Sequence, residues 1–80
     1  MTTENDPKTI FHDGKIDLNE AQKTIGGYIR PLYGLRGDRV LLCDEDGEPK
    51  NLPLNHEASR LAGQPIRGTV IILDSKEMME

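Results

Sequence analysis

The chain has 80 residues, one cysteine, three aromatic side chains and a formal net charge of −4. A chain of this length builds one small hydrophobic core, and a single cysteine excludes an internal disulfide. The acidic balance argues against general affinity for DNA, RNA or an anionic membrane, because those partners attract clustered lysine and arginine. No apolar run approaches the roughly 18 residues of a membrane-spanning helix. We therefore expect a cytoplasmic protein that binds neither nucleic acid nor membrane.

The N-terminal third predicts a tail, a short strand and a helix. Residues 1–7 lack apolar periodicity, which is typical of a flexible tail, and residues 8–11 predict a short strand. Residues 17–25 predict a helix of about two turns, because Asp17 suits the N-cap and apolar side chains recur on one face. Gly26 is expected to end this helix with a positive φ.

A hairpin is expected next. Residues 28–33 and 39–43 are rich in strand-forming side chains, and the glycine-containing segment between them favours a turn. Pro31 has no backbone N–H to donate, so the first strand is expected to have a free edge or a bulge at that point.

The remaining segments predict an acidic turn, a second helix and a last strand. Asn55 suits the N-cap of a helix over 56–62, which Gly63 ends. Residues 69–73 are apolar at four consecutive positions. We therefore place this strand inside the sheet or at a subunit interface.

These elements predict an α+β fold: a small single domain with a mainly antiparallel sheet of about four strands and two short helices. The domain is expected to span 8–74, with residues 75–80 as a C-terminal tail. A domain this small, with few aromatic side chains, gains stability by burying apolar surface between copies. We therefore expect a homo-oligomer, most simply a dimer.

Metal-binding and nucleophilic side chains occur without the spacings that such sites need. The acidic run 44–46 lacks the ligand pattern of an EF-hand, so a solvated turn explains it, and Cys43, His12 and His56 lack the paired spacing of a zinc site. Cys43 ends an apolar strand and no sequence neighbour lowers its pKa, so we expect a small buried side chain. We expect no metal, no cofactor and no enzymatic activity.

The arginines fall in two basic segments on either side of an acidic one. Residues 21–43 carry +3 and residues 58–73 carry +2, whereas 44–57 carry −4. The planar guanidinium suits phosphate or carboxylate, a tyrosine ring can stack on a base, and glycine allows close approach to backbone. The candidate ligand-binding residues are Gly27, Tyr28, Arg30, Arg39, Arg60 and Arg67.

Two alternatives to this site stay open. The arginines can pair with the acidic side chains of 44–48 inside the fold, which leaves no net field for a ligand. Tyr28, Arg30 and Arg39 stand together only if the corresponding faces of the two hairpin strands coincide. If those faces differ, the two arginines are solvated charges at a sheet edge.

Four short motifs follow one another along the chain, and their order and spacing together form a moderately specific pattern. Gly26-Gly27-Tyr28-Ile29 precedes an acidic turn ending at Gly47, then Leu52-Pro53-Leu54-Asn55, then Gly68-Thr69-Val70. The pattern covers roughly residues 8–73 and resembles an uncharacterised family of short domains found in phages, plasmids and actinobacterial or firmicute genomes. The resemblance implies a mobile-element accessory protein, located in the host cytoplasm if a phage encodes it.

Two alternative functions are compatible with these features, and the first is the one we expect. The first is a non-enzymatic binding protein that sequesters a phosphorylated, nucleotide-like signalling molecule to counter host defence. The second is a protein-interaction module that inhibits a host protein through acidic loops and an edge strand. If the protein binds a ligand, the arginines should converge on a pocket. If it inhibits a partner, it should have an acidic or apolar surface and no such pocket.

Overall fold

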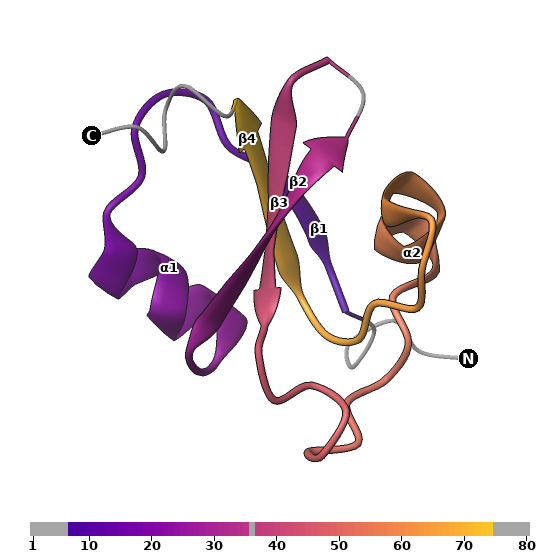
Figure 1. Ribbon diagram of the computed structural model, residues 1–80. Helices are drawn as coiled ribbons and strands as arrows, with labels where there is room; N and C mark the ends of the chain where they lie inside the picture. The colour runs from indigo at the N-terminus through magenta and orange to yellow at the C-terminus, as the bar shows by residue number, and fades with distance from the viewer. Residues whose placement is uncertain (1–6, 36, 75–80) are drawn as a thin grey trace.

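A four-stranded sheet with one helix on each face is the framework of the molecule (Figure 1). The computed structural model describes residues 7–35 and 37–74. The predicted C-terminal tail at 75–80, and all of the predicted N-terminal tail at 1–7 except Pro7, lie outside the described residues. The elements in chain order are β1 (Thr9–Phe11), α1 (Leu18–Ile25), β2 (Ile29–Leu35), β3 (Arg39–Asp44), α2 (His56–Ala62) and β4 (Val70–Asp74). Within the described ranges, no helix has the length and apolar character needed to cross a bilayer.

The strands lie in the order β1-β4-β3-β2. The β2–β3 and β3–β4 pairs are antiparallel, whereas β1 and β4 pair in parallel. The predicted α+β class, four strands and two short helices are confirmed, and the sheet is mixed. β4 lies between β1 and β3, which confirms that the most apolar strand is inside the sheet.

Both faces of the two central strands are buried, because side chains alternate along a strand and each helix covers one face. The cluster under α1 consists of Ala21, Ile25, Val40, Leu42, Ile71 and Leu73. The cluster under α2 consists of Leu41, Cys43, Ala58, Ile66, Val70 and Ile72. Residues of β3 with odd numbers therefore face α2, and those with even numbers face α1.

The apolar run of β4 offers no surface to a second copy. Its residues Val70–Leu73 are at most 2% exposed within a single chain. Of the two places that the sequence left open for this run, the interior of the sheet is the one observed. The expected homo-oligomer stays a prediction, and it needs another contact surface.

Both helices begin and end at the residues that the sequence indicates. The side chains of Asp17 and Asn55 each accept a hydrogen bond from a backbone N–H in the first turn of the following helix, at 3.1 and 3.0 Å. Gly26 and Gly63 end the helices in the left-handed region, with φ of 99° and 73°. These positions favour glycine because a Cβ makes that conformation costly.

Of the two features expected at Pro31, the free edge is observed, whereas the irregularity in β2 comes after Pro31, which itself pairs in register with Leu42. Strand β2 lies at the edge of the sheet, and its register with β3 shifts between Leu32 and Leu35. A proline is tolerated there because an edge strand has one row of backbone groups without a partner in the sheet.

Candidate ligand-binding site

The hairpin register decides how the predicted arginines are arranged. Arg30 lies opposite Cys43 and Leu32 lies opposite Leu41, so Arg30 and Arg39 share the α2 face of the sheet. They lie at opposite ends of the hairpin, because the partner of Arg39 is Leu35. The strand faces therefore coincide, but the two arginines contribute to different cavities.

The first cavity, here called the arginine cavity, has a volume of about 540 Å³ and contains Arg39 and Arg60. Three strands contribute one residue each, and the last turn and cap of α2 contribute the rest. The lining residues are Leu35, Arg39, Arg60, Leu61, Ala62, Gly63 and Ile72. Two guanidinium groups thus lie beside apolar side chains, with no carboxylate in the lining.

Arg39 also contacts an aromatic ring. Its guanidinium carbon lies 5.8 Å from the centroid of the Phe11 ring on β1, and Phe11 is 56% exposed. This cation–π contact favours one orientation of a long, flexible side chain. Arg39 therefore joins the lining of the arginine cavity to an exposed aromatic ring that lies outside that lining.

The second cavity, here called the mixed-charge cavity, has a volume of about 310 Å³ and contains Arg30 and Arg67. The acidic turn after β3 contributes Glu45 and Glu48 to the same lining. Its apolar part comes mainly from the strands and from the segment before β4: Leu32, Cys43 and Ile66. Both cavities open on the α2 face, but only this one combines cations with exposed carboxylates.

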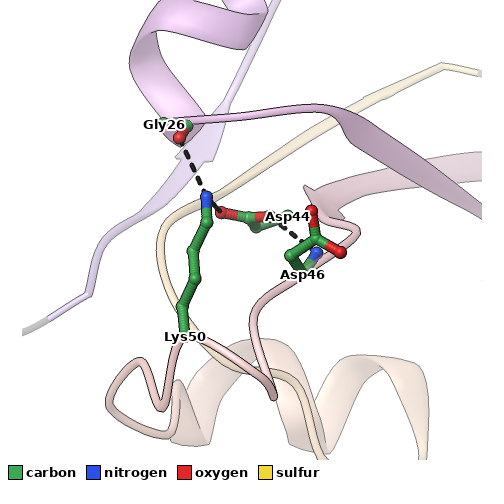
Figure 2. A network of polar contacts seen from close by, with 4 residues as sticks. All are labelled: Gly26, Asp44, Asp46 and Lys50. Carbon is green, nitrogen blue, oxygen red and sulfur yellow. Dashed lines mark hydrogen bonds and ion pairs between the residues drawn. The ribbon is translucent and has the colours of Figure 1, made fainter.

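The acidic turn is not wholly solvated, which corrects the expectation for its first residue. Asp44 is 6% exposed; its carboxylate accepts a hydrogen bond from the Asp46 N–H at 2.8 Å and from the Lys50 ammonium at 2.9 Å. The Lys50 ammonium also donates to the carbonyl oxygen of Gly26 at 3.1 Å (Figure 2). A buried carboxylate needs such partners, and here they fasten the turn to the end of α1.

Gly27 has an intramolecular reason to lack a side chain. A Cβ at this position would lie 2.7 Å from Lys50 Nζ and 3.4 Å from both carboxylate oxygens of Asp44. The glycine thus leaves room for the ion pair. Gly27 lines neither cavity, and Tyr28, 71% exposed, lies outside both as well.

Arginines do not neutralise the acidic turn in the part of the chain that the structure describes. The ion pair made there uses Lys50, and no ion pair joins Arg30, Arg39, Arg60 or Arg67 to the turn among those residues. Arg67 donates from Nη1 to the carbonyl oxygen of Leu52 at 2.8 Å. The internal pairing that would have removed the field of the arginines is therefore not observed there.

Cys43 has the environment of a small buried side chain, as expected. It is 6% exposed, and its thiol donates to the carbonyl oxygen of Arg30 at 3.5 Å. Burial raises the pKa of the thiol above its ordinary value; the nearby Arg30 charge lowers it and the Asp44 charge raises it, each by less. Among residues 7–35 and 37–74, no three His, Cys, Asp or Glu side chains cluster as a metal site would require.

Asn55 makes hydrogen bonds beyond the helix cap that the sequence predicts. Besides capping α2, its Oδ1 accepts from the Thr9 hydroxyl at 3.2 Å, and its Nδ2 donates to the carbonyls of Lys8 and Gly68 at 3.3 and 3.1 Å. Asn55 thus joins the start of α2 to β1 and to the segment before β4. No local sequence pattern distinguishes such a buried amide from an ordinary cap, because its other partners are distant in sequence.

A protein-family model described as "Domain of unknown function (DUF3846)" matches residues 2–79. Neither the comparison with curated proteins nor that with solved structures found a match. The family match agrees with the expected resemblance to an uncharacterised family of small domains. The expected link to phages and plasmids stays a prediction.

Proposed function

Since the chain belongs to the DUF3846 family, whose description assigns no activity, we propose a function from the chain's own geometry: it binds a phosphorylated, nucleotide-like small molecule in the arginine cavity. The observation that carries the proposal is that Arg39 and Arg60 line the same cavity, whose other residues are apolar and include no carboxylate. Binding of such a molecule without turnover lowers its free concentration, and we propose that the chain counters a host-defence signal in this way.

The lining of the arginine cavity suits a ligand with a charged end and an apolar body. Guanidinium groups bind phosphate oxygens through paired, charge-assisted hydrogen bonds. Leu35, Leu61 and Ile72 offer apolar surface to the remainder of the ligand. A volume of about 540 Å³ lies within the range typical of small-molecule sites.

The arginines of this cavity are available to an anion despite the net charge of the chain. Asp74 is the cross-strand neighbour of Arg39, and no ion pair joins them within the described residues. Arg60 lies in the last turn of α2, where the helix carbonyls favour a cation and help to keep it in place. The acidic turn belongs to the other cavity.

The proposal is for binding without chemistry. The arginine cavity is lined by aliphatic side chains, a glycine and guanidinium groups, which stay protonated in proteins. None of these side chains is a nucleophile or can exchange a proton near neutral pH, so the lining holds a phosphate without attacking it.

Isothermal calorimetry against a panel of linear and cyclic nucleotides tests the proposal. At least one nucleotide is expected to bind with a Kd below about 100 µM, which corresponds to roughly 5.5 kcal/mol. Arg60→Ala is expected to weaken binding at least about tenfold, by loss of a charge-assisted contact. Arg30→Ala, the matched arginine of the mixed-charge cavity, should change affinity less than about threefold. If no nucleotide binds below about 100 µM, the proposal is rejected.

The second candidate is a protein-interaction module, favoured by the exposed tyrosines at the β2 edge. Tyr28 and Tyr33 are 71% and 65% exposed, and β2 has a free edge to which an extended segment of a partner can add. Tyr33→Asp would weaken a partner bound at this edge and leave a nucleotide titration unchanged. Rejection of the nucleotide proposal makes this edge the surface to test.

A further inference from the structure

We infer that the mixed-charge cavity is a second binding site, for a small zwitterion of the α-amino acid type. The inference is independent of the proposed nucleotide site, because the two cavities share no lining residue. An α-amino acid has a carboxylate and an ammonium group within a few bonds of each other. The lining of this cavity offers partners of both signs in the same small volume.

Four charged side chains of the cavity are available to a ligand, whereas a fifth, Asp44, is paired with Lys50. Arg30 and Arg67 line it together with Glu45 and Glu48, and within residues 7–35 and 37–74 no ion pair links either arginine to either glutamate. Guanidinium groups bind carboxylates through a planar fork, and carboxylates accept hydrogen bonds from an ammonium. A phosphorylated ligand would meet the repulsion of the glutamates here, whereas a zwitterion uses both signs.

Arg67 is held in place before any ligand binds. Its Nη1 donates to the carbonyl oxygen of Leu52 at 2.8 Å, and its backbone forms an isolated antiparallel β-bridge with Leu54. A guanidinium has five N–H donors, so this contact leaves donors for a ligand carboxylate. Because the side chain is already ordered, binding costs less conformational entropy than it would at a free arginine.

The acidic turn is packed directly against Arg67. Gly47 is buried, and a Cβ added to it would lie 3.3 Å from the Arg67 carbonyl oxygen. Asp44 and Lys50 fasten the two ends of this turn to each other and to Gly26 (Figure 2). Glu45 and Glu48 are therefore presented by an anchored turn, at a fixed place relative to Arg67.

The apolar part of the lining and the volume limit the ligand to a small one. Leu32, Cys43 and Ile66 supply apolar surface for a side chain, and the Cys43 thiol stays neutral because burial raises its pKa. The volume of about 310 Å³ lies at the lower end of the range for ligand pockets. A single amino acid fits this description better than a nucleotide or a peptide.

NMR titration of the ¹⁵N-labelled chain tests the inference. The probes are L-glutamine, L-leucine, L-phenylalanine and L-arginine, each paired with its N-acetyl and carboxamide derivatives. At least one amino acid is expected to shift the amide signals of Gly47, Ile66 and Arg67, and each blocked derivative should bind at least about tenfold more weakly, since it lacks one charge. No shift up to about 10 mM, or equal binding of the blocked forms, would overturn the inference.

Substitutions of single charged residues then test which side chains bind the charged groups of the amino acid. Arg30→Gln and Glu48→Gln are each expected to lower the affinity for the best-binding amino acid at least about fivefold. Arg60→Ala, in the arginine cavity, should leave its affinity unchanged. If Arg60→Ala lowers the affinity for the amino acid as much as Glu48→Gln does, the ligand is not in the mixed-charge cavity and the inference is wrong. Nucleotide binding is read by calorimetry, so failure of either site is seen separately.

Discussion

The two cavities on the α2 face differ in what lies beside their arginines. Each contains two arginines and apolar side chains from the strands. In the arginine cavity the other side is the apolar end of α2, whereas in the mixed-charge cavity it is the acidic turn. Arginines that the sequence indicates as one candidate site therefore line two separate cavities. We propose that the neighbouring wall sets which ligand charge each cavity prefers.

The two walls are also fastened by different means. α2 is held at its start by the neutral hydrogen bonds of Asn55, which is 3% exposed. The acidic turn is held by the ion pair between Asp44 and Lys50, whose side chain is 40% exposed. Disrupting one fastening at a time separates the contributions of the two walls.

Asn55→Ala is expected to have the largest effect, a loss of about 2–4 kcal/mol in the free energy of unfolding. The variant removes a helix cap and leaves the buried carbonyl of Gly68 without the Asn55 amide that donates to it. Urea unfolding measures the loss, and Asn19→Ala, an exposed helix position, is the matched control. A loss below about 0.5 kcal/mol would show that α2 does not depend on this amide.

Asp44→Asn should cost less, about 1–3 kcal/mol in the free energy of unfolding. The substitution removes the charge that holds Lys50, and water can replace part of the interaction because Lys50 is 40% exposed. Glu45→Gln, which neutralises an exposed neighbour, should stay within about 0.5 kcal/mol of the parent. Equal stabilities of the two variants would mean that the ion pair does not fasten the turn.

Leu61→Glu brings an acidic side chain into the arginine cavity and should make it resemble the mixed-charge cavity. Leu61 is 43% exposed in the lining, so the substitution is expected to leave the fold intact. Nucleotide affinity is expected to fall about tenfold, equivalent to roughly 1.4 kcal/mol, while Leu61→Gln loses less than about threefold. Similar losses for both variants in calorimetry would show that shape, and not charge, controls this site.

The smallest expected effect is that of Cys43→Ala, which should change how the free energy of unfolding depends on pH. Burial raises the pKa of the thiol in the folded chain, so the unfolded chain loses its proton at a lower pH. This contribution to stability is complete below the unfolded pKa of about 8.5 and is lost as the pH rises toward the folded pKa. Urea midpoints from about pH 7 to 10 should therefore fall less in Cys43→Ala than in the parent. Parallel curves would contradict the shift.

The elements were predictable from the sequence because their signals are local. The caps at Asp17 and Asn55, the glycines that end both helices and the apolar run of β4 each act within a few residues. The parallel pairing of β1 with β4 was not predictable. It joins segments about 60 residues apart, such as Thr9 and Val70, and depends on packing across the whole sheet.

The candidate site was predictable only as a set of residues. Sequence indicated the arginines, but their division between cavities depends on the β2–β3 register and on the place where α2 ends. The burial of Asp44 did have a local signal. It shares its side of β3 with Val40 and Leu42, and a carboxylate on a buried face needs a partner such as Lys50.

Charge selection by the two walls is tested most directly by mapping where a phosphorylated ligand binds on the α2 face. Adenosine monophosphate titrated into the ¹⁵N-labelled chain should shift the amide signals of Arg39, Gly63 and Ile72 in the arginine cavity. The signals of Gly47, Ile66 and Arg67 should move little, because carboxylates beside them repel the phosphate. The opposite pattern, with the shifts centred on Gly47 and Arg67, would contradict the claim that the acidic wall directs phosphate to the arginine cavity.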